Sequence, residues 1–249
     1  TFRFILGNIQ DNFEQQSFND LKIKEFEELE QYILHKLFML DKSIKENLAT
    51  YNFHKLYKEL LNFCTLDLSS FYFDIRKDTL YCDNLKSKKR KDCIIVLNII
   101  LECLLKWYAP IFVFTTEEIF NLIKKDSSSI HEYNFPKVLS SWENNNLDTK
   151  WRKLFKLKQK ANVAIEEKRA SKEIGSSLEA ELTIKADEEN FKLLENLDLA
   201  EYFITSKAVK IKSDKKDDLT INVAKTSGNK CPRCWKILDK DCQRCKQAV

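Results

Sequence analysis

Glycine and proline are rare in this chain, which has three of each among its 249 residues. Tight turns and β-rich folds use these two residues often, whereas the interiors of long helices exclude them. The scarcity therefore favours a mainly α fold and argues against an all-β architecture. Hydrophobic residues make up 43% of the chain and charged residues 32%, which is typical of a globular protein with a sizeable core.

Apolar residues in the first half recur with the period of amphipathic helices. Between residues 21 and 52 the recurring positions are Phe26, Leu29, Ile33, Leu37 and Leu40. A second helix is predicted to begin near Leu56 and to run through FYFDIRKDTLYC. A third, IIVLNIILECLLKWYAP, is apolar around most of its surface and should be buried. We expect residues 1–125 to form an antiparallel helical bundle.

Two local signals divide that bundle further. Pro110 should end or kink the buried helix, because proline lacks an amide hydrogen and clashes with the preceding turn. Thr115 or Thr116, followed by two glutamates, predicts the start of the next helix. The charged run SKKRK at 87–91 is predicted to be a solvated loop.

The pattern changes in the second half. Residues 126–148 are polar and are predicted to be a loop, and a helix is predicted from Thr149 to Ile174, ending at Gly175. Alternating apolar residues then predict strands in LEAELTIKA, KAVKIK and DLTINVAK, with a helix in EENFKLLENL between the first two. The expected domains are a helical bundle over 1–148, a linking helix with a small α+β module over 149–228, and a terminal module over 229–249.

Charge is distributed unevenly along the chain, although the net charge is only +4. Residues 150–173 contain nine basic and three acidic residues, and 205–249 contain twelve basic and five acidic residues. The stretch between them, 174–204, has two basic and eight acidic residues. Two basic segments around an acidic one suit contact with a phosphate backbone, but a solvated helix face and a lysine-rich tail would look the same.

The eight cysteines fall into two groups. Four lie singly in apolar, helix-like sequence and are predicted to be buried free thiols: Cys64, Cys82, Cys93 and Cys103. A disulfide framework is not expected in a chain of this length without a secretory signal. No apolar run reaches the length of a membrane span, so no membrane association is predicted.

The other four cysteines form two C-x-x-C pairs near the end, Cys231 with Cys234 and Cys242 with Cys245. Two such turns can present four thiolates to one tetrahedral Zn²⁺. We favour one structural zinc ion, while an iron–sulfur cluster or redox chemistry remains open. A closed Cys₄ site has no free coordination position, so it would shape a surface and would not activate water.

That surface is basic and carries one indole, with Arg233, Trp235, Lys236, Lys240, Arg244 and Lys246. The indole of Trp235 could stack on an unpaired base, or it could cap the zinc site against the α+β module. Both readings remain open from the sequence.

Several stretches, in order along the chain, resemble bacterial-type isoleucyl-tRNA synthetases. These stretches are TFRFILGNIQD, FHKLYKELLNFCTLDLSSFYFDIRKDTLYCD, LKWYAPIFVFTTEEIF, AIEEKRASKEIGSSLEAEL and CPRCW with the second C-x-x-C. The seven-residue spacer between the cysteine pairs departs from the family, in which a longer spacer is expected. This departure bears on the size of the finger more than on its metal.

The resemblance implies a cytoplasmic, monomeric enzyme that joins isoleucine to tRNA(Ile) using ATP and Mg²⁺, with an editing domain against valine. The catalytic and editing parts would lie upstream, since the chain begins TFRFILGNIQ without an initiator methionine and reads as a piece of something longer. The piece would be the tRNA-binding part, with a helical anticodon-binding domain, an α+β module and a zinc finger. No catalytic residue is predicted within it.

The basic helix after residue 149 and the finger are the expected tRNA-binding surfaces. The predicted tRNA-binding residues are Lys150, Trp151, Arg152, Lys153, Lys156 and Lys160 on the helix, and Arg233, Trp235 and Arg244 on the finger. His35, His54 and His131 are scattered and are expected to be structural. Two alternatives are a free-standing RNA-binding zinc-finger protein and a DNA-repair glycosylase with a similar terminal finger, although the latter should have a β-rich first domain.

Overall fold

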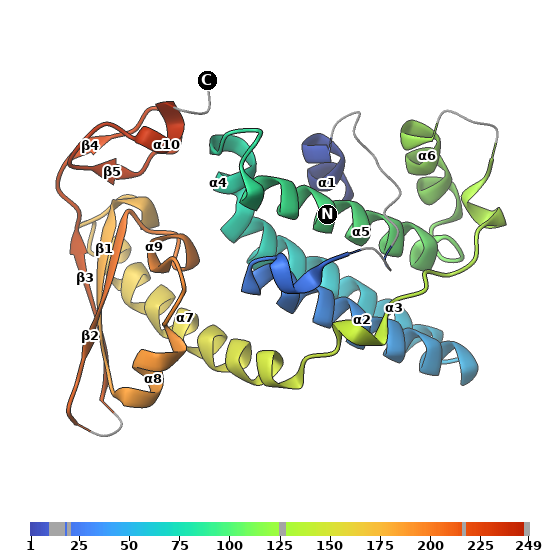
Figure 1. The fold of residues 1–249 in the computed structure, drawn as a ribbon, viewed down its shortest axis with the longest axis horizontal. Helices are drawn as coiled ribbons and strands as arrows, with labels where there is room; N and C mark the ends of the chain where they lie inside the picture. Colours follow the sequence, from blue (N-terminus) through green and yellow to red (C-terminus); the bar gives the residue numbers. More distant parts are fainter. Residues whose placement is uncertain (10–17, 19–20, 125–127, 216–217, 247–249) are drawn as a thin grey trace. The chain divides into compact units, whose positions relative to one another are not determined.

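The computed structural model describes residues 1–9, 18, 21–124, 128–215 and 218–246 (Figure 1). It divides into two compact units. The first comprises Thr1–Leu80 and Leu85–Asn144, and the second comprises Tyr81–Asn84 together with the chain from Asn145 onward. Among the described residues, no helix combines the length and the apolar character that crossing a membrane would require.

The first unit is helical throughout its described secondary structure. Its α-helices are α1 (Phe2–Ile9), α2 (Glu28–Ala49), α3 (Phe53–Asn62), α4 (Phe73–Cys82), α5 (Lys88–Tyr108) and α6 (Val113–Ile123). The last two residues of α4, Tyr81 and Cys82, are grouped with the second unit. Short 3₁₀ turns are η2 (Ile23–Glu25), η4 (Ile130–Glu132) and η5 (Ser140–Trp142), and η3 (Phe63–Tyr72) is a π-helical stretch that joins α3 to α4. The predicted helical bundle is confirmed.

The bundle is organised around α5, which contacts α1, α2 and α6 (Figure 1). Its side chains from Val96 to Leu105 include a run of apolar groups with at most 1% of their surface exposed, as the apolar sequence predicts. The helix ends at Tyr108, so the expected break at Pro110 is confirmed.

The start of α5 corrects one expectation. The run SKKRK is not a loop, because Ser87 caps the helix and Lys88–Lys91 form its first turn. The Ser87 hydroxyl accepts a hydrogen bond from the Arg90 amide at 3.2 Å, which satisfies one of the free amides at the helix start.

The start of α6 also differs from the prediction. The helix begins at Val113, and the preceding Phe112 provides no side-chain cap. Thr116 lies inside the helix, where its hydroxyl donates to the Phe112 carbonyl at 2.9 Å. A threonine that binds the carbonyl four residues back is compatible with a helix interior, so its presence alone did not mark a helix end.

The second unit joins a long helix to a small sheet. Helix α7 (Asn145–Ala170) begins four residues before the predicted Thr149, and the chain leaves it at Lys172, which has a φ of +61°. The predicted stop at Gly175 is therefore too late, because a lysine takes the left-handed conformation that glycine usually supplies. The helix contacts β3 of the sheet.

The three strands that the alternating sequence predicts form a sheet in the order β2-β1-β3. They are β1 (Ala180–Ala186), β2 (Lys207–Lys212) and β3 (Leu219–Lys225). The central strand β1 is parallel to β2 and antiparallel to β3, with Leu182 facing Ala208 and Val223. Its alternate residues, Ala180, Leu182, Ile184 and Ala186, are fully buried. Helices α8 (Glu188–Leu193) and α9 (Leu199–Tyr202) lie between β1 and β2 in sequence, preceded by η6 (Ser177–Glu179).

The terminal module is a short two-stranded ladder followed by one helical turn. Strand β4 (Asn229–Lys230) pairs antiparallel with β5 (Ile237–Leu238), and α10 (Gln243–Lys246) follows. Gly228 precedes the ladder with a φ of +128°, and a Cβ there would lie 2.5 Å from the Leu238 carbonyl oxygen. Only glycine fits this position, which lets the two strands approach closely.

Candidate metal centre and nucleic-acid interface

The two C-x-x-C pairs come together in the terminal module. The Sγ atoms of Cys231, Cys234, Cys242 and Cys245 all lie within 4.8 Å of one another. Cys231, Cys234 and Cys245 are each less than 9% exposed, and Cys242 is half-buried. Four sulfur atoms from two turns at this separation can surround one ion, which is the arrangement that a tetrahedral Cys₄ site needs.

Each pair is shaped by a backbone hydrogen bond across its turn. The Trp235 amide donates to the Cys231 carbonyl at 3.0 Å, and the Lys246 amide donates to the Cys242 carbonyl at 3.1 Å. Trp235 has a φ of +63°, which turns the chain sharply after the second cysteine. The Cys231 amide then donates to the Lys236 carbonyl at 2.9 Å and closes the first turn.

The thiols of this cluster have unequal affinities for protons. Burial alone would raise the pKa of Cys231, but hydrogen bonds from the backbone amides of Cys234 and Arg233, and from neighbouring thiols, lower it to about 7. Burial raises the pKa of Cys234 to about 11, and it also raises the pKa of Cys245. Four soft sulfur donors crowded together suit a thiophilic dication such as Zn²⁺, because a dication offsets the charge of ionised thiols.

The module is tied to the sheet next to β2. The Ile237 amide donates to the Ser206 hydroxyl at 2.6 Å, and Lys207 forms an ion pair with Asp239 at 3.0 Å. The Ser206 hydroxyl in turn donates to the carbonyl of Leu178. The cysteine cluster therefore has a fixed attachment to the α+β module on this side.

Trp235 does not cap the cluster against the α+β module. Its side chain is 60% exposed, and the Lys230 ammonium lies 5.7 Å from the centroid of its ring. Of the two readings left open by the sequence, burial against the module is wrong, because most of the Trp235 side chain is exposed. An exposed indole beside a lysine suits stacking on a nucleic acid base.

Arg233 and Arg244 both contact the segment Tyr81–Asn84 of the same unit. Arg233 Nη2 donates to the Tyr81 carbonyl at 2.9 Å, and Arg244 Nε lies 2.8 Å from Asp83 Oδ1. The sequence assigns both arginines to tRNA contact, and nothing in it indicates that they reach residues about 150 positions away. In this structure they are engaged within the protein.

The basic residues of α7 lie mostly on its exposed side. Arg152, Lys153, Lys156 and Lys160 are exposed, and Lys150 is half-buried. Arg152 pairs with Asp148 at 2.6 Å, and Lys153 pairs with Glu189 at 2.6 Å. Exposed ion pairs of this kind are weak, so both side chains remain exchangeable with a phosphate group.

Trp151 is a correction to the predicted set. Only 2% of its surface is exposed, and its ring packs edge-on against Tyr202 at a centroid distance of 5.7 Å. It belongs to the buried stripe of α7 with Leu147, Leu154 and Ala161, spaced three, four and seven residues apart. A base cannot stack on a ring that is enclosed by the protein core.

Two further residues of α7 escaped sequence reasoning. Phe155 is 44% exposed between the basic residues Arg152 and Lys156, where it adds an aromatic surface. Lys158, counted above among the basic residues of this segment, is buried, and its ammonium donates to the Tyr202 carbonyl at 2.5 Å. The helical period distinguishes the two residues. It places Phe155 on the exposed face of α7 and Lys158 on the face that carries the apolar stripe.

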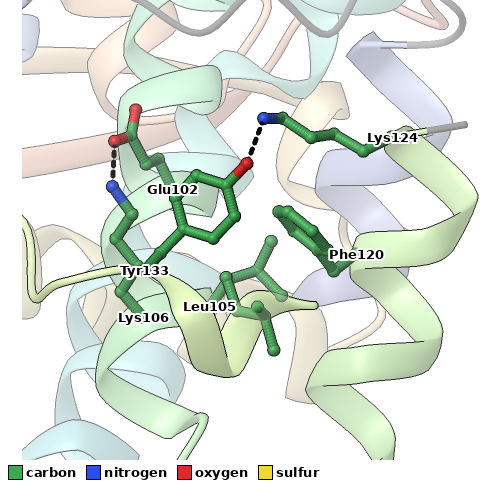
Figure 2. Close-up of a pocket in the computed structure, with 7 residues that line it drawn as sticks. Glu102, Leu105, Lys106, Phe120, Lys124 and Tyr133 are labelled. Carbon is green, nitrogen blue, oxygen red and sulfur yellow. Dashed lines mark hydrogen bonds and ion pairs between the residues drawn. The ribbon is translucent and has the colours of Figure 1, made fainter. Parts of the chain in front are cut away.

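The first unit has a small pocket between α5, α6 and η4 (Figure 2). Lys106 and Glu102 pair at 2.5 Å on α5, and Lys124 donates to the hydroxyl of Tyr133 at 2.7 Å. The ring of Tyr133 also packs against Phe120, with centroids 5.3 Å apart. The polar groups around the pocket thus bind one another. We interpret the pocket as a gap in the packing between helices and not as a ligand site.

His35 has the structural role expected of it. His35 is 1% exposed, and its Nδ1 accepts a hydrogen bond from the Asn144 amide at 3.0 Å. This bond fixes the chain that leads out of η5 onto the side of α2. A buried imidazole with a backbone partner of this kind is a packing element.

Comparison with known proteins identifies the fold family. Residues 30–184, from α2 to β1, match the model described as the anticodon-binding domain of tRNA ligase. The chain belongs to this family. Similar proteins include isoleucine–tRNA ligases from three bacteria. The chain is 52% identical over 244 residues to the protein of Pelagibacter ubique, 36% over 248 residues to that of Agrobacterium fabrum and 39% over 238 residues to that of Methylacidiphilum infernorum.

These alignments cover 98%, 95% and 95% of the chain, respectively. The chain spans about a quarter of the length of these relatives, since it covers 27%, 25% and 25% of them. The anticodon-binding domain match includes α7 and the start of the sheet, and the cysteine cluster lies beyond it. A family of this description binds tRNA, and the exposed basic side of α7 lies within the matched region.

Proposed function

We propose that this chain is the tRNA-binding part of an isoleucine–tRNA ligase and that it holds tRNA(Ile) by its anticodon arm. The observation that carries the proposal is the alignment with isoleucine–tRNA ligases over 98% of the chain, at 52% identity in one relative. A separate catalytic part would attach isoleucine, using ATP and Mg²⁺. The proposal includes a cytoplasmic location and a monomeric state, which come from the family resemblance.

The physical chemistry of α7 supports an RNA ligand. Its exposed side carries Arg152, Lys153, Lys156 and Lys160, with Phe155 between them. Unpaired RNA is recognised through phosphate contacts and through stacking of splayed bases on aromatic or guanidinium planes. We assign the lysines to contacts with the phosphate backbone of the anticodon arm, and Phe155 to a contact with a base or sugar. Lys150, which is half-buried, remains among the proposed tRNA-binding residues.

The cysteine cluster has a supporting role in this proposal. One Zn²⁺ held by Cys231, Cys234, Cys242 and Cys245 would have no open position, so it would not take part in ligation chemistry. The metal would fix the two turns and present Trp235, which is 60% exposed, as a stacking platform. The proposed set of tRNA-binding residues therefore includes the exposed Trp235 and excludes the buried Trp151.

The structure argues against the alternative of a DNA-repair glycosylase. A glycosylase of that type would require a β-rich first domain, whereas the described secondary structure of the first unit is helical. The remaining alternative, an RNA-binding zinc protein without a ligase part, would bind RNA with no preference for tRNA(Ile).

A charge reversal on α7 tests the proposal. Lys156→Glu should weaken binding of tRNA(Ile) about tenfold at low salt and reduce the slope of log affinity against log salt by about one, because a phosphate contact is lost. Fluorescence anisotropy at several salt concentrations measures both quantities. Lys192→Glu on α8 makes the same change of charge at an exposed position outside α7.

The control variant should leave the slope within error of the unaltered chain. An unchanged slope in Lys156→Glu would remove α7 from the tRNA interface. A chain that binds no tRNA at low salt would overturn the proposed function itself.

A further inference from the structure

The two cysteine turns share a feature beyond their ligand spacing. In each of them an arginine stands directly before the second cysteine, as CPRC for Arg233 and CQRC for Arg244. Both arginines reach the same four-residue segment, Tyr81–Asn84. Arg233 donates to a backbone carbonyl at 2.9 Å, and Arg244 pairs with a carboxylate at 2.8 Å that is 14% exposed.

Cys82 occupies the centre of this contact. It is 3% exposed and forms one buried cluster with Cys231, Cys234 and Cys245, against which Cys242 also packs. Cys82 is not among the four sulfur atoms that lie mutually within 4.8 Å, so the geometry does not make it a fifth ligand. Cys82 makes an apolar contact with the cluster. In sequence it lies between Tyr81 and Asp83, the two residues that the arginines contact.

We propose that Tyr81–Asn84 is the docking site of the cysteine module, with Arg233 and Arg244 as the positioning residues that hold the module on it. The closeness of the two turns sets the spacing of the two arginines, so metal loading and docking are coupled. When the turns are held together, both arginines reach the segment. When they separate, at most one of them does.

The module needs such a site on physical grounds. Residues 229–246 are too few to bury a core of their own, so they depend on a metal and on neighbouring surfaces. The attachment at Ser206 and Lys207 fixes one side of the module. Tyr81–Asn84 provides a second attachment through one charge-assisted hydrogen bond, one ion pair and a buried thiol. Two attachments define an orientation, whereas one would leave a hinge. This inference concerns the protein alone and does not depend on the proposed tRNA ligand.

Alkylation of Cys82 in the metal-loaded protein measures docking directly. The four cysteines of the cluster are protected when they hold metal, and Cys64, Cys93 and Cys103 are buried in the first unit. Peptide mass spectrometry after timed treatment with N-ethylmaleimide therefore reports on Cys82, with those three thiols as an internal reference. Bound zinc is determined on the same samples by elemental analysis.

The double variant Arg233→Ala and Arg244→Ala should raise the rate of Cys82 alkylation about tenfold while zinc stays at one per chain, because a charge-assisted hydrogen bond and an ion pair no longer oppose opening. Lys240→Ala removes an exposed positive charge from the same module and should leave the rate unchanged. An unchanged Cys82 rate in the double variant would overturn the proposal.

A charge exchange separates specific pairing from general destabilisation. Arg244→Asp alone should accelerate Cys82 alkylation, and adding Asp83→Arg should restore most of the original protection, because the pair is re-formed with opposite polarity. If the exchanged pair is as exposed as the single variant, the Arg244–Asp83 contact does not hold the module.

Discussion

At the scale of single residues, the first unit depends on a buried charge pair. Arg76 is 2% exposed, and its Nε and Nη2 contact the two carboxylate oxygens of Glu30 at 2.7 and 2.6 Å. The hydroxyl of Tyr72 donates to the same carboxylate at 3.1 Å. Burial raises the pKa of Tyr72 well above its usual value, so the phenol keeps the proton that this hydrogen bond requires.

Removing one partner of this pair should be costly. Arg76→Met leaves the Glu30 carboxylate buried without its cation, and the expected loss in free energy of unfolding is about 3–5 kcal/mol. Arg152→Met, which removes an exposed partner of Asp148, should cost less than about 1 kcal/mol. Urea denaturation followed by circular dichroism measures both losses. Similar small losses in the two variants would show that the buried pair does not stabilise the unit.

Residue positions were predictable where the sequence reports burial or ligand spacing. The cysteines of α5, Cys93 and Cys103, are buried as their apolar surroundings predict. Trp151 could have been placed in the core from its spacing to Leu154 and Ala161, and the basic residues around it obscured that pattern. Trp235 lies in a cysteine turn, where periodicity does not report whether a side chain is exposed.

Among the helices and strands, the types were predictable, whereas several of the ends were not. Alternation correctly predicted β1, β2 and β3, and Pro110 correctly ended α5. The ends differ because local contacts decide them. Ser87 starts a helix within a charged run, and Lys172 leaves one in a left-handed conformation. Serine and lysine occur at many other kinds of position, so neither residue type identifies such a boundary alone.

The terminal module is the element whose stability should depend most on metal. Structural zinc contributes about 10–16 kcal/mol in small zinc modules, so removing it should unfold residues 229–246. Replacing both Cys242 and Cys245 with serine should abolish zinc binding and expose the amides of Trp235 and Lys246 to hydrogen exchange. The amides of α5 should remain protected, since they belong to the first unit.

Cys64→Ser is the matched control for that experiment. It changes a cysteine of the first unit and should retain one zinc per chain by elemental analysis. Full zinc content in the double serine variant would mean that other residues hold the metal.

At the scale of the whole molecule, the sequence predicted the family and the order of the parts but not their long-range contacts. The motifs from the first helix to CPRCW support the relationship that the family match and the relatives bear out. The contacts of Arg233 and Arg244 with Tyr81 and Asp83 join positions about 150 residues apart. No local pattern encodes such a pairing, because it arises only when the chain has folded.

Recognition of the anticodon arm of tRNA(Ile) by this chain is the proposal on which the assigned function rests. Its most direct test is the affinity of the 249-residue chain for a tRNA(Ile) transcript and for the same transcript with its three anticodon nucleotides replaced. We expect the replacement to weaken binding at least about tenfold at moderate salt, because base contacts are lost while phosphate contacts remain. Equal affinity for the two transcripts would contradict it.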